Sequence, residues 1–175
     1  MVILALDTAT VTGWALGEAG KIPASGSVRL KRPQDHRDVA PFNAQCFLRD
    51  MWETAQPDLV VIEEFMNPAA QKSADAISLQ LMVYGVVVAL CQSYTIPYRA
   101  VHRMTIVKHF LGPQRRQQRA ELKAKVVGRA ILLGYMPRGH TDQNRADACA
   151  AFDYGAAYFA RVPPAELVMF GEEAS

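Results

Sequence analysis

Three acidic residues occupy positions from which separate elements of a fold can bring them together. Asp7 and Glu63 each follow a short apolar run, at residues 2–6 and 59–62, and Asp147 lies near the start of an alanine-rich segment. Converging carboxylates repel one another unless cations lie between them. Oxygen ligands suit Mg²⁺ or Mn²⁺, and two such ions about 3.5–4 Å apart stabilise both the attacking water and the leaving oxygen of a phosphodiester. We therefore expect a two-metal site that hydrolyses a nucleic-acid backbone.

A fourth ligand is available near Asp147 from either of two residues. Asn144 lies three positions earlier, so a helix places both on one face, and its amide oxygen can act as a neutral ligand. Asp142 lies off that face and is more typical of a charge at a helix N-terminus, but it remains the alternative ligand. Alone, Asp7 could cap a turn, Glu63 could end an exposed strand and Asp147 could be solvated; only their joint placement favours a site.

Basic residues gather around a predicted loop and the helix that follows it. The net charge is only +2, from 19 Lys and Arg against 17 Asp and Glu, so overall charge does not indicate a nucleic-acid partner. The local cluster either is a solvated loop or contacts phosphates beside the acidic site. The predicted DNA-binding residues are Lys108, Arg115, Arg116, Arg119, Lys123 and Lys125.

Apolar periodicity and turn residues predict the elements that must position these groups. The chain has 175 residues, half of them apolar, which suffices for one domain, expected at 1–165 with a tail at 166–175. The predicted order begins with consecutive strands and continues with strands that alternate with helices. This order favours an α/β sandwich with a mixed central sheet. Strands are expected at 2–6, 11–16, 25–30, 59–62 and 96–100, and helices at 41–54, 74–91, 102–111, 120–133 and from about 141.

Several classes of protein are disfavoured. The N-terminus lacks a basic leader, and three widely spaced cysteines suggest neither a disulfide framework nor a zinc site, so we expect a cytoplasmic location. The apolar stretch at 77–91 falls short of the roughly 20 residues that span a bilayer, so no membrane is expected. That helix is either buried or the core of a symmetric dimer interface.

With these residues in place, a resemblance is clear. LALDTATVTGWAL, VVIEEFM and NRADACAAF resemble, in the same order, the strand, strand and helix motifs of the RuvC family of Holliday junction resolvases. Residues 70–90 are similar to the family's long helix, and residues 101–112 to the helix before its DNA-facing basic segment. The resemblance covers most of residues 1–160.

The resemblance implies an RNase H-like three-layer α/β sandwich with a five-stranded sheet, in a homodimer that makes paired nicks in branched DNA. It implies that Asp7, Glu63 and Asp147 are ligands of Mg²⁺ or Mn²⁺, and that Lys123 corresponds to a functionally important lysine. We hypothesise that Asp7 bridges two ions, that Glu63 and Asp147 hold one each, and that Lys123 neutralises charge on the phosphate.

Two departures from the family's pattern stand out. The turn after Asp7 lacks the Pro-Gly of many members, and Asn144 stands where the family usually has an acidic residue or a histidine. The fourth ligand therefore stays open between Asn144 and Asp142. A divergent member, bacterial or phage-encoded, fits both departures.

Two competing hypotheses remain. MVILALDTATVTGWAL also resembles the phosphate-binding hairpin that opens the actin-like ATPase fold, although the chain lacks that fold's second glycine-rich phosphate loop. The departure at Asn144 also allows a structure-selective DNA-binding protein with an impaired nuclease site. Binding of phosphates by basic residues needs no divalent ion, so metal dependence separates that protein from an enzyme.

Overall fold

Five strands form one mixed sheet. The structure is a computed structural model and describes residues 1–64, 74–113 and 118–163. The sheet order is β3-β2-β1-β4-β5, with β1 antiparallel to β2, β2 antiparallel to β3, and both β1–β4 and β4–β5 parallel. The strands are β1 (Val2–Asp7), β2 (Val11–Glu18), β3 (Ala24–Arg29), β4 (Leu59–Glu63) and β5 (Tyr98–Val101).

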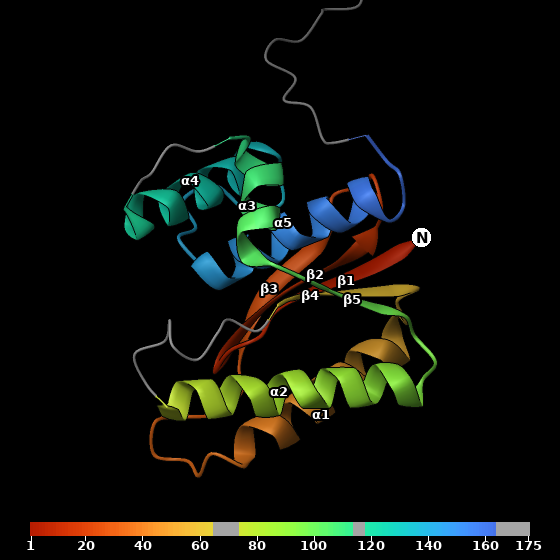
Figure 1. The fold of residues 1–175 in the computed structure, drawn as a ribbon, viewed down its shortest axis with the longest axis vertical. Coiled ribbons are helices and arrows are strands. Elements are labelled where there is room, and N and C mark those ends of the chain that lie inside the picture. The colour runs from red at the N-terminus through yellow and green to blue at the C-terminus, as the bar shows by residue number, and fades with distance from the viewer. Residues whose placement is uncertain (65–73, 114–117, 164–175) are drawn as a thin grey trace, which may run out of the picture.

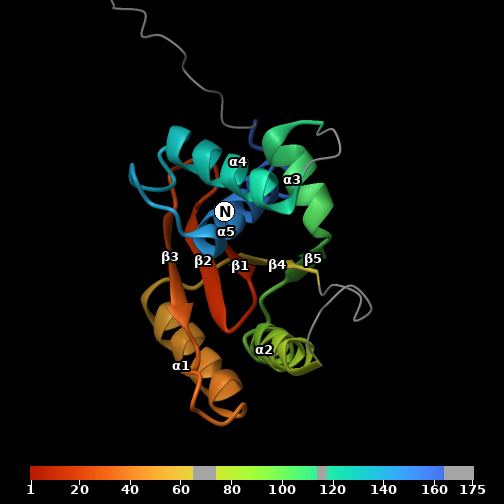
Figure 2. The same ribbon diagram turned by 90° about the vertical axis from the view of Figure 1, so that its left-hand side faces the viewer.

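Helices cover both faces of this sheet, which gives three layers (Figures 1 and 2). One face carries α1 (Val39–Thr54) and α2 (Ala74–Ser93). The other carries α3 (Arg103–Leu111), α4 (Arg119–Leu132) and α5 (Gln143–Tyr158), of which α5 packs directly on β1 and β2. The predicted α/β sandwich with a mixed five-stranded sheet is confirmed, and each expected element within the described residues is present with ends shifted by a few positions.

The alternation of side chains along the central strands decides which layer each residue faces. Ile3 and Ala5 of β1 pack in the core under α3, α4 and α5, as does Val61 of β4. Leu4 and Leu6 pack instead in the core under α1 and α2. Because the period is two, the last residue of β1 and the last residue of β4 both lie on the face that α5 covers.

Small residues let α5 lie unusually close to the sheet. A Cβ placed on Gly13 of β2 would lie 1.9 Å from the Asn144 carbonyl oxygen, and one on Gly155 would lie 2.9 Å from Val61 Cγ2. Between these two approaches, Ala146 and Ala150 are almost fully buried. The alanine-rich sequence of α5 is therefore explained by contact with the sheet along its length.

The apolar helix α2 is longer than the 77–91 stretch on which the expectation of no membrane rested. Its 20 residues are by length and composition enough to cross a membrane, so length does not exclude a span, and the absence of a membrane partner stays a prediction. One side of α2 is nevertheless packed as in a core helix, with Leu79, Val83 and Val87 buried. A single helix of this length and composition is weak evidence for a membrane span.

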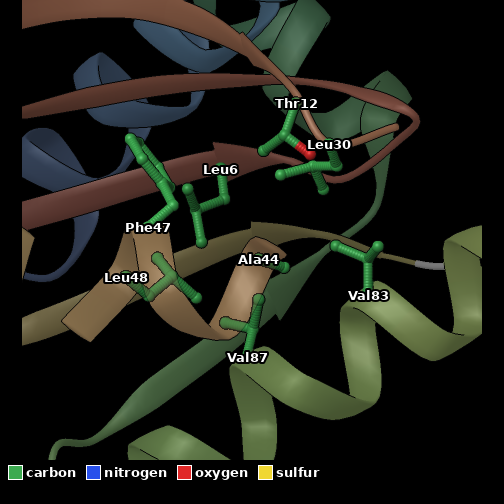
Figure 3. A pocket seen from close by; sticks show the side chains of 8 residues that line it. All are labelled: Leu6, Thr12, Leu30, Ala44, Phe47, Leu48, Val83 and Val87. Atoms are coloured by element: carbon green, nitrogen blue, oxygen red, sulfur yellow. The ribbon is translucent and has the colours of Figure 1, made fainter. Parts of the chain in front are cut away.

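A small apolar pocket lies where β1 meets α1 and α2 (Figure 3). Its volume of about 10 Å³ is at the lower limit for one water molecule, and no charged side chain lines it. We interpret it as a packing gap, because it offers neither room nor polar partners to a ligand. The lining residues are Leu6, Thr12, Leu30, Ala44, Phe47, Leu48, Val83 and Val87.

Candidate active site

Three carboxylates from three elements meet at one edge of the sheet. Leu6 of β1 is the register partner of Ile62 of β4, so Asp7 and Glu63 end neighbouring parallel strands on the face beneath α5. Asp147 lies in the second turn of α5. Glu63 and Asp147 are each 6% exposed, and Asp7 is partly exposed. The structure therefore brings together the three acidic residues that the sequence singled out.

Burial and proximity disturb the ionisation of all three groups. The pKa of Asp7 is raised well above its ordinary value, first by desolvation and then by the charges of Glu63 and Asp147. Desolvation is also the main reason why the pKa values of Glu63 and Asp147 are raised. Such a cluster holds its negative charge at a cost in free energy, which a bound cation would relieve.

Arg103 supplies positive charge that the sequence analysis missed. Its Nη2 donates to Asp147 Oδ2 at 2.9 Å, and its Nη1 lies 3.5 Å from Glu63 Oε1. Arg103 opens α3 directly after β5, whose last residue Val101 pairs with Glu63. The His102 side chain caps this helix by accepting a hydrogen bond from the Met104 amide at 3.2 Å. The only signal in the sequence was an arginine placed just after a strand that proved to adjoin β4.

Lys123 approaches the carboxylates from α4. Its Nζ donates to Gln143 Oε1 at 3.0 Å, at the first residue of α5. Its charge also acts to lower the pKa values of Asp7, Glu63 and Asp147, although the desolvation of each group outweighs it. Lys123 is thus close enough to reach a phosphate bound at this edge.

The other predicted DNA-binding residues divide into three groups. The charge of Arg119 reaches Asp147, which places Arg119 on the same side as Lys123. Lys108 is exposed, and Lys125 forms an ion pair of 3.2 Å with Glu121 within α4. Two further predicted residues, Arg115 and Arg116, lie outside the described residues.

The two candidates for a fourth ligand differ in their surroundings. Asp142 is the N-cap of α5: its Oδ1 accepts from the Arg145 amide at 3.1 Å, and its Oδ2 accepts from the Ser27 hydroxyl at 2.6 Å. Capping explains Asp142 without a metal. Within the part of the chain that the structure describes, no hydrogen bond occupies the Asn144 amide, which leaves it available.

The donor chemistry fits a hard divalent cation, although the side chains are not arranged around one. Three carboxylates with raised pKa values and one nearby amide make an oxygen-rich set of the kind that Mg²⁺ and Mn²⁺ prefer. Among residues 1–64, 74–113 and 118–163, no three acidic, His or Cys side chains converge closely enough to hold an ion as they stand. The Arg103 guanidinium lies against two of the carboxylates instead.

Comparisons with known proteins were made against families, curated proteins and solved structures. No family model matches the sequence, and no curated protein does. RuvC of Thermus thermophilus in complex with a Holliday junction substrate has a TM-score of 0.66 at 17% identity, over 95% of this chain and 99% of that chain. A second structure of Thermus thermophilus RuvC has a TM-score of 0.64 at 18% identity with the same coverage.

A more distant likeness is to the yeast mitochondrial Holliday junction resolvase. Its TM-score is 0.53 at 9% identity, over 86% of this chain and 75% of that chain. Identities this low show the fold alone. The chain has the RuvC-like form of the RNase H-like fold, as the resemblance in the motifs implied.

Proposed function

We propose that the protein is a metal-dependent endodeoxyribonuclease that resolves four-way DNA junctions by paired nicks. The convergence of Asp7, Glu63 and Asp147 at one edge of a RuvC-like fold carries this proposal. Two solved structures with this fold support the substrate class: one is in complex with a Holliday junction substrate, and another is named as a Holliday junction resolvase.

The three carboxylates would hold Mg²⁺ or Mn²⁺, with Asn144 as the neutral ligand. When bound, two such ions lower the pKa of an attacking water and stabilise the leaving oxygen. The protein's own part is to keep three anions together in a largely buried setting. The close packing of α5 on Gly13 and Val61 holds Asp147 over the strand ends that carry Asp7 and Glu63.

Lys123 and Arg119 would orient the DNA backbone. Both extend from the first turns of α4, and the charges of both reach Asp147. A cation placed beside a scissile phosphate attracts the strand and neutralises negative charge that grows during cleavage. The ammonium of Lys123, now bound to Gln143, can exchange this neutral acceptor for a phosphate oxygen.

A homodimer would supply the second active site that paired nicks require, and the outer side of α2 is the surface we propose for it. Leu81 on this side is 46% exposed. A Cβ added to Gly85 would meet nothing within 4 Å, so no contact within the described chain requires a glycine there. Glycine in a helix interior costs about 1 kcal/mol relative to alanine, and close approach of a second α2 would account for it.

One alternative function has an observation in its favour. Arg103 already neutralises two of the carboxylates, and Asn144 carries no charge. Both features suit a protein that binds branched DNA through basic residues without cutting it. Such binding would persist without divalent ions.

Cleavage of a labelled four-way junction, with and without Mg²⁺ or Mn²⁺, tests the proposal. We expect nicks that depend on the metal, and far weaker cleavage of a linear duplex of the same sequence. Tight, metal-independent binding of the junction without cleavage would favour the alternative. A protein that neither bound nor cleaved the junction would refute both the proposed function and the alternative.

A further inference from the structure

Arg103 is a largely buried cation to which the proposed chemistry gives no role. Its side chain is 16% exposed and lies against the buried carboxylates of Glu63 and Asp147. Its position depends on local structure, because it is the first residue of α3 and follows both the end of β5 and the His102 cap. Burying a guanidinium is costly without partners, so these contacts are part of how the site folds.

Charge balance indicates what Arg103 does when metal is absent. Asp7, Glu63 and Asp147 carry three negative charges when ionised, and among the residues that the structure describes, Arg103 and Lys123 are the two cations whose charges act on all three. Together they leave one negative charge uncompensated. The site as folded is thus close to neutral without a divalent ion.

Arg103 pairs with one oxygen of each of two carboxylates that would hold a metal ion. Mg²⁺ binds oxygen ligands at about 2.0–2.1 Å, whereas the guanidinium lies 2.9 Å from Asp147 Oδ2 and 3.5 Å from Glu63 Oε1. A divalent ion bound through these two oxygens cannot share this space with the guanidinium. With that coordination, one cation must leave when the other arrives.

We propose that Arg103 is a built-in counter-ion of the metal-free site, which a divalent cation displaces from Glu63 and Asp147. This inference rests on the proposed function and adds a residue that sets how tightly the site binds metal. In the absence of metal, Arg103 keeps the buried carboxylates from repelling one another. Its competition with metal lowers the affinity of the free protein for the ion.

Displacement would also link metal binding to DNA binding. The guanidinium is anchored at the start of α3, so after release it stays at the rim of the site. A phosphate is the partner that best replaces a lost carboxylate, because a guanidinium donates two parallel hydrogen bonds to either group. Metal and DNA would then favour each other's binding.

Titration of Mn²⁺ into the full-length protein without DNA tests this inference. We compare wild type with Arg103→Gln by calorimetry and thermal melting. Arg37→Gln is the matched control, since it removes the same charge from an exposed arginine that lies 3.9 Å from Asp38. Arg103→Gln should bind Mn²⁺ at least about tenfold more tightly, which corresponds to about 1.4 kcal/mol. It should also melt at a lower temperature without metal, whereas Arg37→Gln should match wild type in both measurements.

Equal or weaker Mn²⁺ binding by Arg103→Gln would overturn the inference, because Arg103 would then be holding the carboxylates in place for the metal. The proposed function would stand if wild type still bound Mn²⁺ in a way that Asp7→Asn abolished. Absence of Asp7-dependent Mn²⁺ binding in both wild type and Arg103→Gln would instead refute the proposed function. If Arg103→Gln does not fold, Arg103→Lys replaces it in the test. Lysine keeps the charge but cannot contact Glu63 and Asp147 through two separate nitrogens, so this variant should also bind Mn²⁺ more tightly than wild type.

Discussion

Substitution of Gly13 by alanine should reduce the rate of cleavage strongly while the protein still folds. The added Cβ would start 1.9 Å from the Asn144 carbonyl oxygen, and real Cβ contacts do not fall below 3.0 Å, so the start of α5 must retreat by about 1.1 Å. Overpacking of this kind costs about 1–3 kcal/mol of stability. A displacement of about 1 Å at a catalytic group can cost on the order of 100-fold in rate. We therefore expect junction cleavage to fall about 100-fold in a protein that still folds.

Single-turnover cleavage and circular dichroism melting measure these two effects separately. Gly128→Ala is the matched control, because a Cβ on this residue of α4 meets nothing within 4 Å. Alanine there should leave the rate unchanged and raise stability by up to about 1 kcal/mol. If Gly13→Ala cleaved junctions at the wild-type rate, the close approach of α5 would have no part in positioning Asp147 and Asn144.

Three further predictions concern ionisation, the N-cap and the dimer. The pKa of Asp7 is raised above 3.8 on folding, so the folded state binds more protons above that pH, and the stability of the metal-free protein should fall as pH rises through this window. Asp7→Asn should flatten this fall in urea titrations across pH, and an unchanged slope would contradict the raised pKa of Asp7. Asp142→Ala should lose about 1 kcal/mol of stability with Mn²⁺ affinity retained, whereas a tenfold loss of affinity by calorimetry would make Asp142 a ligand. Gly85→Arg should convert a dimer to monomers in light scattering, and an unchanged molar mass would place the interface elsewhere.

The sequence was most informative where local pattern and function coincide. Asp7 and Glu63 could be selected because each ends an apolar run that proved to be a central strand, and strand alternation then decides which face they occupy. Asp147 was a weaker signal, because it was selected only from its place near the start of an alanine-rich segment. Asp153, six residues later on the same helix, is equally buried but accepts a hydrogen bond from Tyr135 and pairs with His109, each at 2.9 Å. Acidic residues in α5 are therefore not all alike, and spacing alone could not separate them.

Features that depend on tertiary contact were not predictable from the sequence. Arg103 reaches the site because β5 pairs with β4, a neighbour relation that no local pattern encodes. The need for glycine at position 13 arises from a helix that begins 130 residues later in the chain. Asp142 was correctly considered as a helix N-terminal charge, but its bond to Ser27 of β3 appears only in the fold.

Single-turnover cleavage of a four-way junction in Mg²⁺ by Asp7→Asn, Glu63→Gln and Asp147→Asn tests most directly whether these residues form one metal site. Asp50→Asn on the exposed side of α1 serves as the control for a lost carboxylate. The account predicts that each of the three variants loses cleavage by more than about 1,000-fold, the scale set by groups that act as one catalytic unit, while Asp50→Asn cleaves as wild type does. Near-normal cleavage by any one of the three would contradict the account.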